Sequence, residues 1–245
     1  MVRRLISIAL LLAVHGLSRL FFRIEMIWVG EIPEDDPWGR LRIVAILNHT
    51  SLYEPIFVGG TPLRFVRRVT DHGVIPVADK TLARPIVGRF FGSLAAHTVS
   101  LSRQRDHTWR EVLEKIHDPK AMVAILPEGR MKRANGLDKE GRPMTVRAGI
   151  ADLLLAVPEG RLLLAYSEGL HHVQAPSQHL PRPFRTVRMR LEAIDIPTYR
   201  ASLLARPGER GFHQVVIDDL TRRRDLYCAP DWRQRLAACE HSRPG

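Results

Sequence analysis

Short apolar runs alternate with segments of helical periodicity along most of this chain. Two runs, at residues 42–47 and 121–126, are almost wholly apolar, which is the pattern of strands buried on both faces of a sheet. Further strands are predicted at 23–29, 64–70, 74–77, 95–101, 161–166 and 186–194. Helices are predicted to begin near Pro55 and to cover 81–91, 108–116, 147–157 and 214–223. This alternation predicts an α/β fold, with a mostly parallel central sheet flanked by helices.

The N-terminus carries the strongest apolar segment. A basic start is followed by a run from Leu5 to Val14 that is apolar except for Ser7, and further apolar residues, interspersed with polar ones such as Arg19, continue to Phe22. The run to Val14 is shorter than the roughly 20 apolar residues of a spanning helix. We therefore expect a membrane-associated helix lying in the interface, with its arginines on anionic lipid. The alternatives are a re-entrant or spanning helix, a cleaved signal peptide, and a helix buried in the core.

Composition and charge narrow the possible partners. The formal net charge is +11 and the sequence pI is about 10.5, so the surface attracts anionic lipid, phosphorylated substrates or nucleic acid. Aromatic residues make up only 7% and are not interleaved with the basic clusters, which argues against nucleic acid. The two cysteines form no disulfide framework, and no Cys/His spacing is typical of a metal site, so no metal is predicted. We divide the chain into residues 1–22, a globular domain at 23–205, and a C-terminal helix and tail at 206–245.

The first candidate for chemistry follows the predicted strand at 42–47. Asn48 and His49 come where this strand ends, and α/β proteins bind ligands beyond the carboxyl ends of their strands. Glu54 stands five residues after His49, and a carboxylate can orient one ring nitrogen of a histidine while the other takes a proton. This pairing requires His49 to lie outside the helix that begins near the following proline. The alternative is that Glu54 only caps a helix beginning at Ser51, in an S-x-x-E capping box.

The second candidate follows the predicted strand at 121–126. Pro127-Glu128-Gly129 predicts a tight turn, and a loop rich in Lys and Arg, beginning at Arg130, comes next. Backbone N–H groups in such a turn, together with arginine, suit an acidic group such as phosphate. The alternative is a solvated basic loop.

Together these stretches resemble the glycerophosphate and lysophosphatidic acid acyltransferase family, whose hallmarks are N-H-x-x-x-x-D and, further along, F-P-E-G-T-R-S. Between the two, the segments Ala78-Asp79-Lys80 and 99–103 look like the family's middle block, which ends in an arginine, here Arg103. The resemblance runs from about residue 23 to about residue 197, and three blocks in register are more specific than any one of them. Glu54 departs from the family's aspartate, and Arg130 from its threonine.

The resemblance implies an acyltransferase domain that moves a fatty acyl group from an acyl thioester to a hydroxyl of a lysophospholipid such as lysophosphatidate. His49 would be the general base, and Glu54 would orient it. The substrate-binding residues would be Asn48, Lys80, Arg103, Glu128, Gly129 and Arg130. The co-substrate would be acyl-CoA or acyl carrier protein, with no bound cofactor and no nucleic acid, at the cytoplasmic face of the cell membrane. The alternatives are a catalytically lapsed lipid-binding member, or an acyltransferase acting on an amino-lipid or glycolipid.

Other polar clusters are expected to carry no chemistry. The run Arg222-Arg223-Arg224 is interpreted as a solvated helix end, with contact to lipid headgroups as the alternative. His107, His171 and His172 are interpreted as surface or packing residues.

Overall fold

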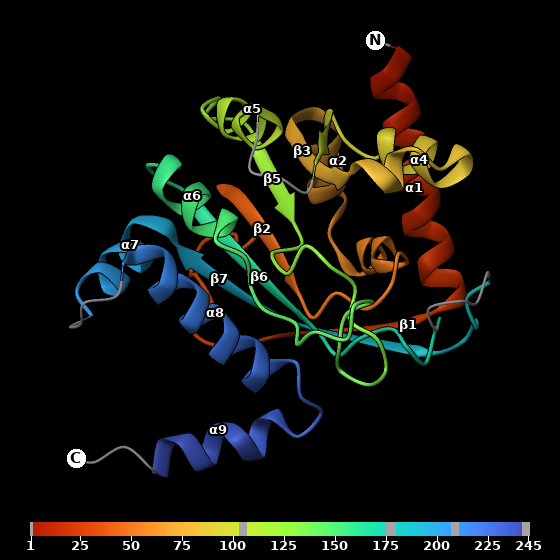
Figure 1. The fold of residues 1–245 in the computed structure, drawn as a ribbon. Helices are drawn as coiled ribbons and strands as arrows, with labels where there is room; N and C mark the ends of the chain where they lie inside the picture. Colours follow the sequence, from red (N-terminus) through yellow and green to blue (C-terminus); the bar gives the residue numbers. More distant parts are fainter. Residues whose placement is uncertain (1, 103–106, 175–179, 207–210, 242–245) are drawn as a thin grey trace.

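A seven-stranded sheet in the order β1-β7-β6-β2-β5-β3-β4 forms the centre of the computed structural model (Figure 1), which describes residues 2–102, 107–174, 180–206 and 211–241. Strands β6, β2, β5, β3 and β4 are parallel, whereas β7 is antiparallel to β6, and β1 is parallel to β7. The predicted α/β fold with a mostly parallel sheet is therefore confirmed. The strands are β1 (Arg23–Trp28), β2 (Leu41–Leu47), β3 (Gly73–Ala78), β4 (His97–Leu101), β5 (Met122–Ile125), β6 (Arg161–Ser167) and β7 (Thr186–Asp195).

Helices cover both faces of the sheet and bury a separate core on each. Alternate residues of β2 serve the two cores, because successive strand side chains point to opposite faces. Ile43, Ala45 and Leu47 pack with α5, α6, α7 and α8, and Val44 and Ile46 pack with α1, η1 and α2. Leu41 also belongs to the second core, because the register shifts between Leu41 and Ile43. The helices are α1 (Val2–Phe21), η1 (Glu54–Gly60, a 3₁₀ helix), α2 (Leu63–His72), α3 (Asp79–Leu82), α4 (Pro85–Gly92), α5 (His107–Ile116), α6 (Gly149–Ala156), α7 (Ile196–Leu204), α8 (Phe212–Tyr227) and α9 (Trp232–His241).

The segment predicted as a strand at 64–70 is instead part of helix α2. Its buried residues Phe65, Val66 and Val69 recur at helical spacing, while Arg64 and Arg67 face solvent. The prediction was wrong because the aromatic and β-branched residues favour a strand locally, whereas packing against the sheet selects the period of 3.6. Helices α7 and α9 were not predicted.

Helix α1 packs along the domain through a side that carries small polar as well as apolar residues. Ser7, Leu11 and Ser18 are buried against the domain, and a Cβ added at Gly59 would come within 2.7 Å of the Ser18 Cβ. The helix is long and apolar enough to cross a membrane, yet only 17% of its apolar window is buried. The outward side carries exposed leucines and isoleucine at Leu5, Ile6, Leu12, Leu17 and Leu20. The helix is therefore not part of a closed core.

Helix α8 is a core element with a buried acidic centre. Val216 and Leu220 belong to one core, and between them in the sequence Asp219 is 1% exposed. Its carboxylate accepts hydrogen bonds from the Tyr199 hydroxyl and from three arginines, Arg206, Arg222 and Arg223. The prediction of a solvated arginine run is wrong for Arg223 and Arg224: Arg223 is mostly buried and also pairs with Glu192, and Arg224 is buried. A local run of charge does not reveal that carboxylates from three elements converge on it.

Candidate active site

The loop leaving β2 turns sharply at Asn48, whose φ of +66° lies in the left-handed region that asparagine tolerates better than most residues. The Asn48 side chain donates a hydrogen bond from Nδ2 to the Ser167 carbonyl oxygen at 2.9 Å, which ties the loop to the end of β6. His49 follows at the carboxyl-terminal edge of the parallel strands and is 8% exposed. The predicted strand-exit position of Asn48 and His49 therefore agrees with the structure.

Glu54 lies against His49 and also holds the loop between them. The distance from Glu54 Oε1 to His49 Nδ1 is 3.1 Å, and the same oxygen accepts hydrogen bonds from the backbone N–H groups of Thr50 (3.0 Å) and Ser51 (2.9 Å). The imidazole N–H is not aligned with the carboxylate, so the contact is electrostatic; such pairs often align only when substrate binds. Helix η1 begins at Glu54 with a proline in its first turn, as the pairing requires. The capping alternative is not met, because no helix begins at Ser51 and helix η1 has no side-chain cap; the bonds from the Thr50 and Ser51 N–H groups hold the loop instead.

Burial and charge act in opposite directions on the pKa of His49. Burial disfavours the imidazolium and lowers the pKa, but the carboxylates of Glu54 and, to a smaller extent, Glu128 outweigh it and raise the pKa above the ordinary value of 6.5. The other ring nitrogen, Nε2, has no hydrogen-bond partner in the described part of the chain. The arrangement leaves His49 able to accept a proton at Nε2 while carboxylates stabilise the resulting charge.

Glu128 lies beneath the histidine loop. Its Oε1 accepts from the Asn48 N–H at 3.2 Å and its Oε2 from the His49 N–H at 2.8 Å, and the residue is 1% exposed. The predicted turn is present: Gly129 has φ +63° and donates from its N–H to the Leu126 carbonyl at 2.9 Å. The Glu128 carboxylate thus binds the backbone of the candidate base. The sequence interpretation had instead assigned Glu128 to substrate binding.

The basic loop presents a different cation to the site from the one expected. Arg130 is paired with Asp138 and Glu140, and these carboxylates raise its pKa. Lys132 instead contacts the histidine loop: its Nζ lies 3.2 Å from Asn48 Oδ1, and its N–H donates to the His49 carbonyl at 2.7 Å. Sequence reasoning did not select Lys132, although it stands in the same basic run.

Lys80 makes no contact with this loop in the described part of the chain. Lys80 is exposed on α3, which directly follows β3 at the same edge of the sheet. Arg103 lies outside the described residues. Their assignment to the site stays a prediction.

The segment after β6 completes the surroundings of the loop. The Leu170 N–H donates to Thr50 Oγ1 at 2.7 Å, and Ser51 Oγ donates to Gln174 Oε1 at 2.6 Å. His171 contacts the Lys132 carbonyl through Nε2 at 2.9 Å, so this histidine has the packing role that was predicted. The signal that could have located this segment is the polar stretch immediately after a buried strand.

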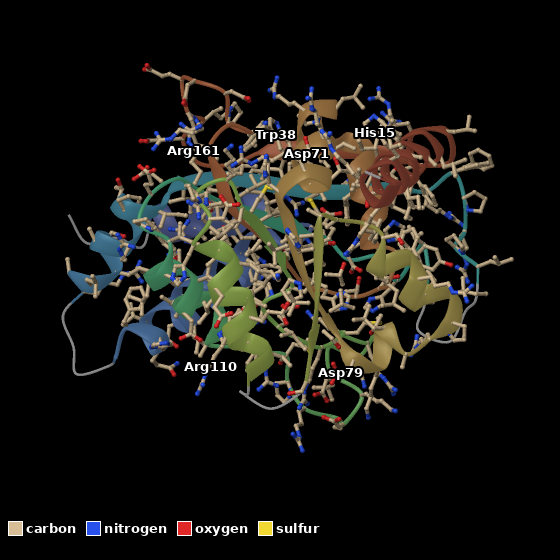
Figure 2. All side chains as sticks on the ribbon, turned by 90° about the horizontal axis from the view of Figure 1, so that it is seen from above. His15, Trp38, Asp71, Asp79, Arg110 and Arg161 are labelled. Atoms are coloured by element: carbon tan, nitrogen blue, oxygen red, sulfur yellow. The ribbon has the colours of Figure 1, made fainter. Side chains whose placement is uncertain are left out.

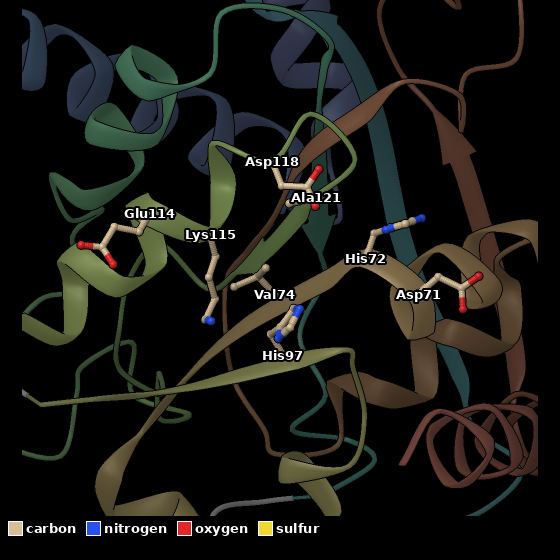
Figure 3. Close-up of a pocket in the computed structure, with 8 residues that line it drawn as sticks. All are labelled: Asp71, His72, Val74, His97, Glu114, Lys115, Asp118 and Ala121. Carbon is tan, nitrogen blue, oxygen red and sulfur yellow. The ribbon is translucent and has the colours of Figure 1, made fainter. Parts of the chain in front are cut away.

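A cavity of about 210 Å³ lies at the opposite edge of the sheet and is separate from His49 (Figure 3). Its lining includes Val74 and His97, near the amino ends of β3 and β4. Figure 2 labels Asp71 and Asp79, which flank β3 and lie on opposite sides of the molecule, Asp71 on the side of this cavity. Since ligands of open α/β sheets bind at the carboxyl ends of strands, the His49 loop is the better candidate.

The described residues contain no cluster of three or more His, Cys, Asp or Glu side chains that could hold a metal ion.

Comparison with known proteins identifies the fold. Neither protein-family models nor curated protein sequences give a significant match. Among solved structures, the chain is similar to the crystal structure of the 1-acyl-sn-glycerophosphate acyltransferase PlsC from Thermotoga maritima, with a TM-score of 0.52 and 17% identity, over 88% of this chain and 78% of that one. The resemblance inferred from the sequence motifs is therefore confirmed at the level of the fold.

Proposed function

We propose that this protein transfers a fatty acyl group from an acyl thioester to a hydroxyl of a lysophospholipid such as lysophosphatidate, with His49 as general base and Glu54 orienting it. The observation that carries the proposal is the position of His49: it lies at a strand exit, its Nδ1 is 3.1 Å from a buried carboxylate, and its Nε2 has no hydrogen-bond partner in the described chain. The fold shared with a lysophosphatidate acyltransferase supports the same reaction class.

The proposed reaction is direct transfer without an acyl-enzyme. The acceptor oxygen attacks the thioester carbonyl carbon while His49 Nε2 removes the hydroxyl proton. Collapse of the tetrahedral intermediate breaks the carbon–sulfur bond, and the imidazolium returns its proton to the leaving thiolate. Glu54 and Glu128 favour the transient imidazolium by their negative charge. No bound cofactor is required, and the donor is acyl-CoA or acyl carrier protein.

Cations near the base favour an acceptor with a phosphate group. Lys132 is adjacent to His49 and has no carboxylate partner in the described residues, whereas Arg130 is already neutralised by two carboxylates. We therefore propose that Lys132 contacts the phosphate. Lys80, at the same edge of the sheet, and Arg103, from the sequence motif, are further candidates. Gly129 and Glu128 shape the turn from which the basic loop starts.

The outward face of α1 supports a membrane-associated protein. From Leu5 to Leu17 this face carries no charged residue, and arginines occur only towards the two ends of the helix. Since its inner face is packed on the domain, the helix cannot have lipid on all sides, which favours insertion into one leaflet over a span. Anionic headgroups complement the +11 net charge. We place the protein on the cytoplasmic face, where acyl-CoA and acyl carrier protein occur.

The test is thiol release and product formation by the purified protein in detergent, with long-chain acyl-CoA or acyl carrier protein as donor. Lysophosphatidate is compared with monoacylglycerol, which keeps its free hydroxyl and has a second hydroxyl in place of the phosphate, and with an amino-lipid and a glycolipid. We expect transfer to lysophosphatidate, and much weaker transfer to monoacylglycerol. Silence with every donor and acceptor, together with retained vesicle binding, would favour a lapsed lipid-binding protein.

Membrane attachment is predicted to depend on the outward residues of α1. Leu12→Glu combined with Leu20→Glu places two charges on the exposed apolar face and should abolish sedimentation with vesicles containing anionic phospholipid. The matched control is Leu204→Glu on α7, whose side chain is as exposed (61%) as Leu20 (67%) but lies on another element. Equal loss of binding in the control would show that attachment does not use α1.

A further inference from the structure

We propose that Arg224, on the C-terminal helix α8, is a positioning residue for His49 and acts through the carboxylate of Glu128. This inference rests on the proposed role of His49 as the catalytic base. Arg224 lies far from the histidine loop in the sequence and belongs to none of the sequence motifs.

The contacts run from α8 to the backbone of the base. Arg224 Nη1 donates to Glu128 Oε1 at 3.4 Å and to the Met144 carbonyl oxygen at 3.0 Å. The two oxygens of Glu128 in turn accept from the N–H groups of Asn48 and His49. The Arg224 guanidinium therefore contacts the Glu128 carboxylate, and this carboxylate binds the backbone of the two residues that follow β2.

Burial makes this chain of contacts sensitive to the loss of any member. The side chain of Glu128 is fully buried and that of Arg224 is 11% exposed. A buried carboxylate without its cation tends to take up a proton or to move towards solvent. Either change removes an acceptor from the Asn48 N–H or the His49 N–H. Asn48 is in the left-handed region, a conformation that persists only where surrounding contacts hold it, and the two bonds from Glu128 act there together with those from Ser167, Glu54 and Lys132.

The end of α8 is itself fixed over the carboxyl-terminal edge of the sheet. The Tyr227 carbonyl accepts from Arg190 at 2.6 Å, and Arg190 is buried on β7 with its guanidinium over the Trp232 ring. The Tyr227 ring also packs on Tyr166 of β6, with centroids 5.0 Å apart. These contacts hold Arg224 in register with Glu128, so the C-terminal helices contribute to the geometry of the base.

The experiment compares Arg224→Met with Arg42→Met, a matched control. Arg42 is 4% exposed and bonds to the backbone carbonyls of Ile116, Asp118 and Ala121, at the amino-terminal edge of the sheet. Both variants lose a buried guanidinium, but only Arg224 is connected to Glu128. Readouts are kcat and KM for lysophosphatidate, the melting temperature, and the NMR signals of the ¹³C,¹⁵N-labelled His49 ring, assigned with His49→Ala and followed through a pH titration.

For Arg224→Met we expect kcat to fall roughly 10- to 100-fold with KM unchanged, and the His49 ring signals and titration midpoint to move. The carboxylates that act on the pKa of that ring in the described chain are Glu54 and Glu128. Lys132 contacts the loop, His171 contacts Lys132, and Arg224 contacts both Glu128 and Asp225. Arg224→Lys, which keeps a cation beside Glu128, should restore most of kcat. Arg42→Met should lower the melting temperature and leave kcat and the His49 signals as in the wild type.

Unchanged His49 signals in Arg224→Met, or equal changes in Arg42→Met, would overturn the inference. The NMR measurement does not require turnover. If the wild type transfers no acyl group, the proposed function fails, and the spectra alone still decide whether Arg224 positions His49.

Discussion

Replacement of His49 by alanine is expected to lower kcat for acyl transfer by about 10²- to 10⁴-fold, the range that a positioned general base contributes. The substitution removes Nε2, the proposed proton acceptor, and leaves the backbone N–H that bonds to Glu128 in place. The fold should persist, since His49 contributes few apolar contacts. Thioester cleavage coupled to lysophosphatidate acylation measures the effect, and His117→Ala, which removes an exposed histidine beside α5, is the control. Near-wild-type turnover in His49→Ala would remove the histidine from the mechanism.

Glu54→Gln separates the charge of Glu54 from its hydrogen bonds. The amide oxygen of glutamine can still accept from the Thr50 and Ser51 N–H groups, but the negative charge that raises the pKa of His49 is gone. A base works only when deprotonated, so wild-type kcat falls as pH drops below this raised pKa. In Glu54→Gln the pKa of His49 is lower, so the acidic limb of the pH–rate profile should move to lower pH while the plateau decreases. An unmoved limb would mean that Glu54 only caps the loop.

The sequence predicted the geometry of the first loop better than that of the second. His49 and Glu54 are five positions apart, so local rules on strand exits and proline were enough to bring them together. The helix begins at Glu54 and not at Ser51, so Glu54 is not a helix cap. One of its carboxylate oxygens instead contacts both His49 Nδ1 and the N–H groups of the loop, a second contact that spacing alone did not reveal.

The environment of Glu128, Arg130 and Lys132 depended on contacts that no local pattern contains. A cation in a basic loop can bind substrate only if no carboxylate of the folded protein is paired with it. Asp138 and Glu140 neutralise Arg130, whereas Lys132 contacts Asn48. Glu128 was predicted only as part of a turn, yet its carboxylate also contacts Arg224 of α8. The same limit explains the arginine run at 222–224, whose partners lie on the loop after β5, on β7, on α7 and on α8 itself.

Asp219→Asn is expected to destabilise the protein by about 3–5 kcal/mol, because it breaks a buried ion cluster by removing its central anion. Asp219 is 1% exposed and forms ion pairs with Arg206, Arg222 and Arg223. Arg223 also pairs with Glu192. For a chain of this size, each kcal/mol corresponds to about 2–4 °C in Tm, so a decrease of roughly 6–20 °C should appear in thermal unfolding. The control is Asp231→Asn, which removes a half-exposed carboxylate paired with Arg235 at the surface of α9 and should leave Tm close to that of the wild type.

The Tm difference between wild type and Asp219→Asn should depend on pH in a defined direction. Burial alone would raise the pKa of Asp219, but Arg223, the Tyr199 hydroxyl and the other arginines outweigh burial and hold it well below the ordinary value. A carboxyl whose folded-state pKa is depressed stabilises the fold above its unfolded pKa of about 3.9 and loses this contribution as pH falls towards the folded value. The Tm difference between wild type and Asp219→Asn should therefore be constant from about pH 8 to pH 5 and shrink below about pH 4. A difference that instead vanished near neutral pH would mean that Asp219 is protonated in the folded protein, and that the arginines of α8 are held by other groups.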